Sequence, residues 1–375
     1  MAQAVFPSAS FRDELKKRGG GSAFRCYQCA TCSSVCELAP ADSPFPRKQM
    51  LYAQWGLADK LAADPSVWLC HQCNDCTVRC PRDAKPGDVM QTVRSLAVEE
   101  MATPKFMGKL VGKARVTWWL LIGIPLAFWM IFIHQVNGFA VPELSTIHGV
   151  ETFAWHDFVP HWMIYVTYVP VTAFVLLMVL ISGAKYWKQM GQTAKRSGSF
   201  IGNLIPAVID ILTHKKFSKC DAAKPRKTGH LIFMFGFIGA AITTALIVVA
   251  MYGWVAEPIP LPLPLSHWMK WIGNISAALL VLGGLILLVN RMRGGNSVGT
   301  STAYDNFFLF VAVMVGFTGI ATALARLYTE PATAIWIYVA HLTFILTLFI
   351  TFPYSKFAHI VYRTLAMVHD RMASK

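Results

Sequence analysis

Charged residues are scarce in this 375-residue chain. Asp, Glu, Lys and Arg together make up 14% of its residues, well below the roughly 25% of an ordinary soluble domain. Hydrophobic residues reach 55% and include 24 Phe and 12 Trp. Disordered and fibrous chains have the opposite balance, since they contain few aromatic side chains. The composition excludes both classes and indicates a large apolar region.

Charged residues are missing altogether from six long apolar windows. These windows are 116–142, 158–184, 228–256, 271–290, 306–325 and 331–355. Each contains the ~20 residues that a helix needs to cross a hydrocarbon core of ~30 Å. Buried helices of a soluble protein are the alternative, but six such windows argue against it. We therefore predict a six-helix membrane domain over 116–365, after a basic linker at 105–115 and before a cytosolic C-terminal tail at 366–375.

Lys and Arg are also rare on one side of the predicted membrane domain. If residues 1–104 are cytoplasmic, the loops and tails on the inner side carry twenty Lys and Arg, and the outer loops carry two. This is the bias of the positive-inside rule. Residues 1–21 lack the apolar core of a secretory signal. We expect both termini in the cytoplasm and the chain in the cytoplasmic membrane. The net charge of +14 then needs no nucleic acid to explain it.

Cysteine is absent from the apolar windows and concentrated near the N-terminus. Two runs follow the pattern C-x2-C-x2-C-x3-C, which bacterial ferredoxins use to hold 4Fe–4S clusters. In that pattern the fourth cysteine of each run binds the other cluster. The predicted ligands of cluster 1 are Cys26, Cys29, Cys32 and Cys80, and those of cluster 2 are Cys70, Cys73, Cys76 and Cys36. Structural zinc is the alternative, although zinc sites usually present cysteines in pairs. Cys220 stands alone, and we interpret it as an ordinary free thiol.

The residues around these two runs predict helices. Residues 48–63 and 87–101 have helical periodicity. The head thus resembles the α-helical ferredoxin domain of heterodisulfide reductase C subunits, which the succinate dehydrogenase iron–sulfur subunit shares. We predict an N-terminal tail at 1–24 and this ferredoxin domain at 25–104. The predicted fold class is all-α, with a two-cluster ferredoxin domain followed by a six-helix transmembrane cytochrome b bundle.

Three of the histidines in or beside the apolar windows, where an imidazole is rare and usually functional, form a pattern. His341 and His359 are 18 residues, or five turns, apart. If one helix contains both, they share a face at a separation of about 27 Å. His230 begins the third window at the inner side, level with His359. Ligation of haem by paired histidines would use all three, with two haem b groups expected and one possible. Hydrogen-bonded core histidines are the alternative.

Residues 160–365 resemble the gamma subunit of respiratory nitrate reductase, a dihaem cytochrome b. The similarity is strongest at 340–363 and extends to 266–269 and 283–293. The resemblance implies an inner haem between His230 and His359. The family's partner for His341 falls on Ala240 here. His134, in the extra first window, is our preferred replacement; His161 is the second choice, and loss of the outer haem is the third.

A two-cluster head fused to such a cytochrome b resembles the C subunits of quinone-interacting membrane-bound oxidoreductase (Qmo) complexes. That resemblance implies menaquinone in the membrane and two cytosolic flavin and iron–sulfur subunits similar to heterodisulfide reductase A. Adenylylsulfate (APS) reductase would lie downstream in sulfate reduction. The expected activity is that of an oxidoreductase subunit that transfers electrons. His267, at the outer side, is the candidate quinone-site residue.

Other functions fit parts of the sequence. The chain can be the membrane subunit of a heterodisulfide-reductase-type complex. It can also be a redox-inactive membrane anchor for a cluster protein, which predicts no haem. A redox sensor coupled to a transporter would need interrupted helices or paired acids at mid-membrane, and the six windows contain no Asp or Glu.

Overall fold

The computed structural model describes residues 6–40, 43–219, 224–253 and 261–373. Within these residues, six helices are long and apolar enough to cross a membrane. They are α9 (Ala114–Asn137), α11 (His161–Met190), α13 (Lys224–Tyr252), α14 (Trp268–Arg293), α15 (Ala303–Tyr328) and α16 (Pro331–Thr351). The prediction of six membrane helices and an all-α fold is confirmed. The only strands described form a small hairpin, β1 (Ser145–Ile147) with β2 (Val150–Thr152), beside α10 (Trp155–Phe158).

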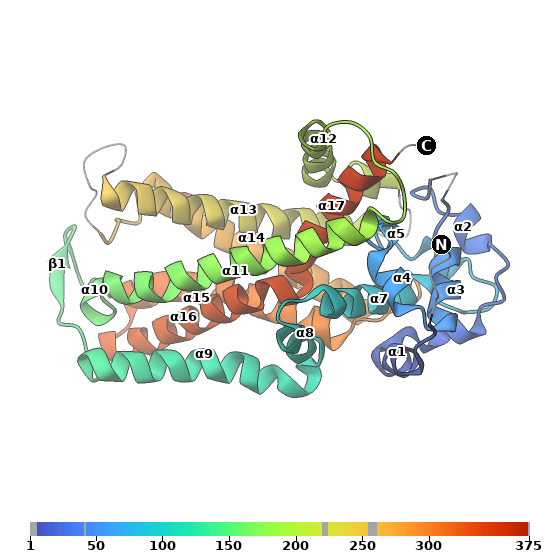
Figure 1. The fold of residues 1–375 in the computed structure, drawn as a ribbon. Coiled ribbons are helices and arrows are strands. Elements are labelled where there is room, and N and C mark those ends of the chain that lie inside the picture. Colours follow the sequence, from blue (N-terminus) through green and yellow to red (C-terminus); the bar gives the residue numbers. More distant parts are fainter. Residues whose placement is uncertain (1–5, 41–42, 220–223, 254–260, 374–375) are drawn as a thin grey trace.

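The six helices form an elongated bundle (Figure 1). Along it α13 packs on α14, α14 on α15, α15 on α16, and α16 on α9. Glycines let the backbones of α13 and α14 approach closely. A Cβ on Gly236 would lie 2.7 Å from the backbone nitrogen of Leu280, and one on Gly283 would lie 2.5 Å from that of Phe233. Small residues at the contact are typical of helices that pack inside a membrane.

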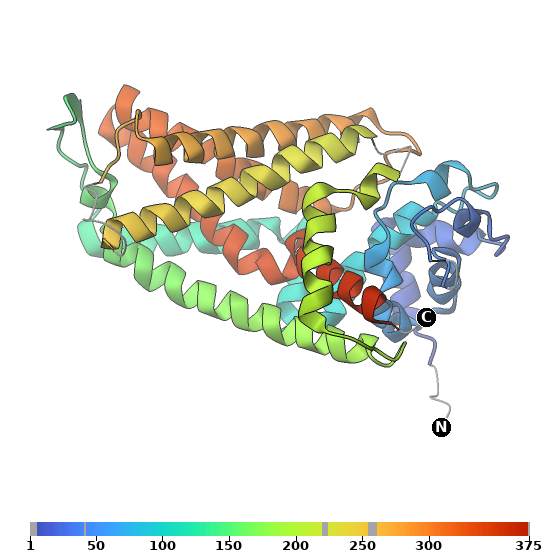
Figure 2. The same ribbon diagram turned by 90° about the horizontal axis from the view of Figure 1, so that it is seen from above.

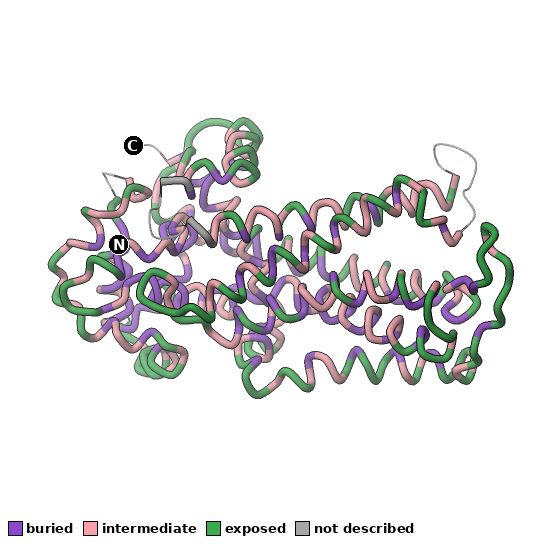
Figure 3. The backbone as a smooth tube through the Cα atoms, turned by 180° about the vertical axis from the view of Figure 1, so that it is seen from behind, coloured by how far each residue is buried: buried purple, intermediate pink, exposed green. Residues whose placement is uncertain are grey.

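The outer faces of the bundle are apolar and exposed. Trp119 on α9, Leu180 on α11 and Phe317 on α15 all have more than half of their surface uncovered. Figure 3 shows exposed and half-buried residues along these helices, with buried residues concentrated at the junction with the head. An apolar surface of this extent is unfavourable in water. Contact with lipid chains explains it.

The head lies at one end of the bundle, where α17 also ends (Figure 1). Its helices are α1 (Ala9–Leu15), α2 (Thr31–Ser34), α3 (Arg47–Trp55), α4 (Ala58–Ala63), α5 (Ser66–Leu69), α6 (Asp75–Val78), α7 (Pro86–Met101) and α8 (Lys105–Gly112). Helix α7 agrees with the predicted helix over 87–101. The single helix predicted over 48–63 is wrong. Gly56 adopts a left-handed conformation with φ 72° and ends α3, as glycine commonly does at a helix C-terminus.

Three predicted tails and linkers are parts of the folded core. Residues 6–25 are largely helical, and Leu15 and Ala23 are fully buried in the head, so residues 6–24 of the predicted tail 1–24 belong to the folded head. The basic linker 105–115 is mostly α8, in which Val111 is fully buried. The predicted C-terminal tail belongs largely to α17 (His359–Met372), whose residue Val368 is fully buried. These corrections share one cause, because each segment has an apolar face too short to stand out in a sequence.

Helix α12 (Phe200–Thr213) crosses the bundle near the head (Figure 2). Ile201, Ile205, Val208 and Leu212 recur along it at intervals of three or four residues, as in an amphipathic helix. Its inner face packs on α17 through Ala207 and Leu204, against Met367 and Val368. The opposite face of α12 carries exposed isoleucines.

The helical path of the chain is interrupted between α16 and α17. Short turns at Phe352–Tyr354 and Lys356–Ala358 separate the two helices, and Ser355 between them is extended. Pro353 lacks the backbone N–H that a continuing helix needs. The premise that His341 and His359 share one helix face is therefore wrong, since His341 lies on α16 and His359 is the first residue of α17.

Leu15→Ala tests whether the N-terminal segment belongs to the head. Removing a fully buried leucine side chain costs about 2–5 kcal/mol of stability. We expect a clear fall in the thermal unfolding midpoint of the detergent-solubilised chain. Phe6→Ala is the control, because Phe6 is 81% exposed. Equal midpoints for Leu15→Ala and Phe6→Ala would contradict the assignment of this segment to the core.

Candidate functional site

The two cysteine loops have the same backbone conformation. The residues on either side of the second cysteine are left-handed in both, with φ 61° and 70° at Gln28 and Ala30 and 55° and 69° at Gln72 and Asn74. Left-handed non-glycine residues are uncommon and raise the energy of the backbone. These turns aim the Gln28 amide at the sulfur of Cys26 (3.4 Å) and the Gln72 amide at that of Cys70 (3.3 Å). Nothing in the sequence signalled this conformation at Ala30.

The folded head places the cysteines in two groups. Cys32 interacts electrostatically with Cys26, Cys80 and Cys29. The cysteine neighbours of Cys36 are Cys70 and Cys73. Cys76 has Cys70 and Cys73 as its foremost cysteine neighbours, ahead of Cys32 and Cys36. The neighbours of Cys32 and Cys36 lie within the predicted sets of cluster 1 and cluster 2, whereas Cys76 has neighbours from both sets.

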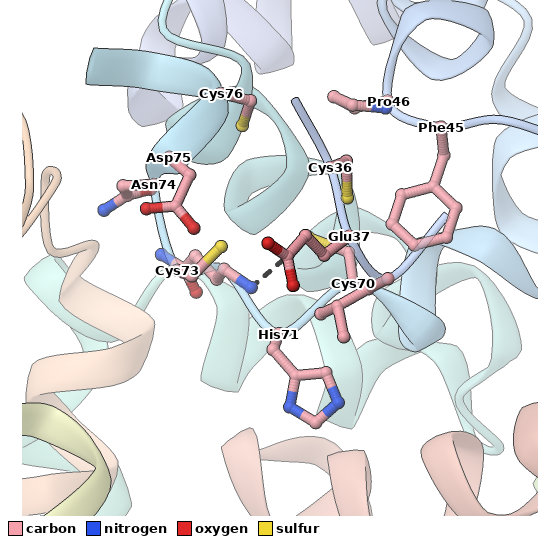
Figure 4. Close-up of a pocket in the computed structure, with 12 residues that line it drawn as sticks. Cys36, Glu37, Phe45, Pro46, Cys70, His71, Cys73, Asn74, Asp75 and Cys76 are labelled. Atoms are coloured by element: carbon pink, nitrogen blue, oxygen red, sulfur yellow. Dashed lines mark hydrogen bonds between the residues drawn. The ribbon is translucent and has the colours of Figure 1, made fainter. Parts of the chain in front are cut away.

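The second group surrounds a hollow of about 420 Å³. The sulfurs of Cys36, Cys73 and Cys76 face this space, whereas the ring of His71 points away from it (Figure 4). Cys70 lines the same hollow. The four predicted ligands of cluster 2 therefore border one space large enough for an inorganic group.

The electrostatics of the thiols fit a cationic group. Burial, reinforced by neighbouring cysteines, raises the pKa of the Cys32 and Cys36 thiols to about 11. Thiols bind metal only as thiolates, so the bound group must supply positive charge. Iron ions supply that charge, and amide N–H groups such as that of Ala84, 3.3 Å from the Cys80 sulfur, stabilise the thiolates further. Among the described residues, no group of three or more His, Cys, Asp or Glu side chains is placed to hold a single metal ion.

Three histidines converge at the end of the membrane bundle next to the head. The rings of His230 on α13 and His359 on α17 have centroids 6.2 Å apart, at 76°. A metal bound at ~2 Å by one nitrogen of each ring would set the ring centres roughly 6 Å apart. Nε2 of His214 and Nδ1 of His230 share a hydrogen bond of 2.8 Å. Nδ1 of His359 bonds the Lys356 carbonyl, so in both rings Nε2 is the nitrogen placed for a metal.

His214 is a residue of this site that the sequence does not indicate, because its position outside the apolar windows predicts a surface histidine. It is 9% exposed and ends α12, where its Nδ1 lies 2.7 Å from the Ile211 carbonyl. Burial lowers its pKa. The one sequence feature that could have indicated a role for His214 is its position between an amphipathic helix and an apolar window. Its contact with His230 depends on how the connecting segment folds back.

Arg363 joins the histidine pair to the second cysteine loop. It lies one turn after His359 and donates to the Cys70 carbonyl at 2.7 Å and to Nδ1 of His71 at 3.2 Å. Arg94 donates to the same Cys70 carbonyl, and Arg226 donates to the carbonyl of His71 at 2.7 Å. Burial, then the Arg363 cation, lowers the pKa of His71 far below its usual value. His71 is thus a neutral ring set among arginines.

The outer histidines are not brought together in the same way. His341 packs against Gly319 and bonds the Thr318 hydroxyl at 2.9 Å. His134 is exposed with its ring near Phe139, and His161 lies near His156. None of the ring contacts in the described part of the chain joins His134 or His161 to His341.

His267 has a structural role in this fold. Its Nδ1 accepts a hydrogen bond from the Met269 amide at 3.3 Å and so caps the first turn of α14. Its ring stacks on Trp268 at 5.8 Å. A capping side chain satisfies a backbone donor that the helix leaves unpaired.

Comparison with known proteins identifies the head. The sequence profile of a 4Fe-4S dicluster domain matches residues 22–84. An Archaeoglobus profundus protein described as similar to the C subunit of heterodisulfide reductase is 39% identical over 89 residues, which are 24% of this chain and 47% of that protein. The C subunit of the H(2):CoB-CoM heterodisulfide,ferredoxin reductase of Methanothermobacter thermautotrophicus is 36% identical over 90 residues, 24% of this chain and 48% of that protein. The chain spans about half the length of these relatives. The head is thus an iron–sulfur domain related to heterodisulfide reductase C subunits.

A second similarity covers the membrane domain. The profile described as citrate utilization protein B matches residues 139–375. Citrate utilization protein B of Escherichia coli is 22% identical over 360 residues, which are 92% of this chain and 88% of that protein. No solved structure matches the chain. Because the profile covers well over half of its residues, the chain belongs to the citrate utilization protein B family.

Proposed function

We propose that this chain is the membrane subunit of an oxidoreductase complex. It would carry electrons between menaquinol or menaquinone and a cytosolic flavoprotein through two 4Fe–4S clusters and an inner haem b. The main observation in support of this proposal is that Arg363 contacts the Cys70–His71 loop from the same helix that contains His359. The two proposed cofactor sites are therefore adjacent. The similarity of the head to heterodisulfide reductase C subunits supports electron transfer as the task.

The proposed cluster ligands are the two cysteine sets predicted from spacing. When bound, the clusters and the haem each accept and release one electron at a time. The protein contributes buried thiols, amide N–H groups aimed at sulfur, and the arginines around Cys70. Positive charge beside a site of this kind favours its reduced form, since reduction adds negative charge.

His230 and His359 would hold the inner haem. His214 fixes the ring of His230, and the Lys356 carbonyl fixes that of His359. Such contacts orient metal-ligating imidazoles and determine which nitrogen faces the metal. His341 has no imidazole against its ring among the described contacts, so the proposal includes one haem. His134 and His161 have no part in it.

We place the head in the cytoplasm. The bias of Lys and Arg supports this orientation, and an even number of membrane helices agrees with α1 and α17 lying at the same end of the bundle (Figure 1). The soluble partner is defined by its chemistry as a flavoprotein similar to heterodisulfide reductase A. APS reductase stays a prediction from the resemblance to Qmo complexes.

A second candidate partner follows from the relative that matches nearly the whole chain. The E. coli protein is named for citrate utilization. A soluble flavoprotein that oxidises citrate or a similar acid would deliver electrons to the same head. The electron-transfer role of this chain is the same with either partner.

Exchange of the fourth cysteine can be tested with Cys80→Ser and Cys36→Ser. We expect about eight iron atoms per wild-type chain and loss of up to about four in each variant, because each would lose one ligand of a 4Fe–4S cluster. Electron paramagnetic resonance should show the loss of a different cluster in each variant. Cys220→Ser is the control and should keep both signals; Cys220 lies outside the described residues. Loss of the same cluster signal from both variants would refute the exchange.

The haem proposal can be tested by counting haem b with the pyridine haemochrome spectrum. We expect one haem per wild-type chain and none in His359→Ala or His230→Ala. His214→Ala should keep both ligands but bind haem about 10–100-fold more weakly, as loss of a contact to a metal ligand does. His156→Ala, at a half-buried outer position, is the control. Two haems would show that His341 is used as well, and zero would favour the membrane anchor.

A further inference from the structure

A second hollow, of about 300 Å³, lies on the other side of His71 from the cysteines. We call it the junction pocket, because it is bounded by the cysteine loop, by α17 and by Lys216 in the turn that follows α12. None of the proposed cluster or haem ligands lines it.

The walls of the junction pocket combine two kinds of side chain. One wall is apolar and contains Trp68, Leu69 and Met367. The other presents Lys216 and Arg363, which can donate hydrogen bonds, and Asp370, which can accept them. Apolar walls with a few convergent polar groups are typical of small-molecule sites. A flat ring with an oxygen at each end matches this lining, because its carbonyl form needs donors and its hydroxyl form needs an acceptor.

The junction pocket is also next to a proposed electron carrier. His71 lines it, and the same residue lines the hollow bordered by the cluster 2 cysteines. Arg363 borders the pocket while bonding the carbonyl of Cys70 at 2.7 Å. A molecule in this pocket would therefore be separated from cluster 2 by the Cys70–His71 segment alone.

Helix α12 packs beside the pocket and carries an exposed apolar face on its other side. Met367, in the pocket wall, belongs to the cluster by which α17 packs on α12. The outward face of α12 carries Ile201, Ile205 and Ile209, which are 67%, 58% and 53% exposed. A helix with such a face lies in the membrane interface with its apolar side in the acyl chains. The boundary between lipid and water then passes beside the pocket.

We propose that the junction pocket binds the ring of a quinone at the inner side of the membrane. This inference rests on the proposed function and moves the quinone site from the outer His267 to the head–membrane junction. Reduction of the ring consumes two electrons and two protons and converts both carbonyls to hydroxyls. The electrons would come one at a time from the cluster that Cys36, Cys70, Cys73 and Cys76 would hold, which the flavoprotein partner would reduce again, and the protons would come from the water at the inner surface.

Binding of 2-heptyl-4-hydroxyquinoline N-oxide, a fluorescent quinol mimic, tests this site. The full chain, carrying its cofactors and held in lipid nanodiscs, is added to the mimic, and the quenching of the mimic's fluorescence is measured. We expect Lys216→Ala to weaken binding about tenfold or more, as loss of a hydrogen bond from a charged donor does. Lys215→Ala is the matched control, because its neighbouring lysine does not line the pocket, and should change affinity less than about twofold. Iron content equal to wild type in both variants verifies folding.

A second measurement is independent of the variants. The mimic should alter the paramagnetic resonance spectrum of cluster 2, the signal lost in Cys36→Ser, while that of cluster 1 stays unchanged. Loss of binding in His267→Ala with full binding in Lys216→Ala would overturn the junction pocket and leave the proposed function intact. Absence of binding to the wild-type chain would instead count against the quinone in the proposed function itself.

Discussion

The arrangement of both cofactor sites depends on one buried carboxylate, Asp305. It stands in the first turn of α15, is 2% exposed, and accepts hydrogen bonds from Gln91 of the head and Lys356 of the turn before α17. The hydroxyl of Thr302, the N-cap residue of α15, also donates a hydrogen bond to this carboxylate. A buried charge is tolerated only when it is paired and hydrogen-bonded. Removal of one partner leaves the charge uncompensated, so the carboxylate requires the head and the turn to be in place together.

This requirement extends to the metal-binding groups on both sides. Gln91 also accepts a hydrogen bond from Gln72, whose amide points at the sulfur of Cys70. On the other side, the carbonyl of Lys356 holds the ring of His359. A single network therefore connects a cysteine of the second cluster loop with a histidine of the proposed haem site. Rigid support of this kind is what metal sites need, since small displacements of a ligand weaken binding.

The features that sequence predicted well are those that depend on local pattern. A membrane helix needs only length and apolar character, so all six were found. The spacing of the cysteines likewise reports a local loop. Prediction failed where a few residues change the path of the chain, as at Gly56 within 48–63. The sequence does contain a signal against a continuous helix through His341 and His359, because Pro353 lies between them and has no backbone N–H to donate.

Contacts between distant segments were out of reach for the same reason. His214 and His230 are 16 residues apart, and their hydrogen bond depends on α12 lying across the bundle. The left-handed conformation of Ala30 has no signal in its residue type. Burial of Leu15 depends on α3 and α7, which no pattern near residue 15 reveals. Local sequence thus indicated the proposed ligands of the candidate site, whereas tertiary packing determined the residues that contact them.

The location of the sites has a consequence for energy conversion. An electron that crosses the whole membrane against a negative interior costs ~2.3 kcal/mol per 100 mV. The proposed clusters, the His230–His359 pair and the junction pocket all lie at the inner end of the bundle. Electron transfer among them crosses little of the membrane potential, and protons exchanged at the pocket return to the same side. The membrane domain then serves to give a lipid-soluble ring access to the clusters, and direction follows from the potentials of the two partners alone. A second haem at His341 would reverse this conclusion, because it would extend the path toward the outer surface.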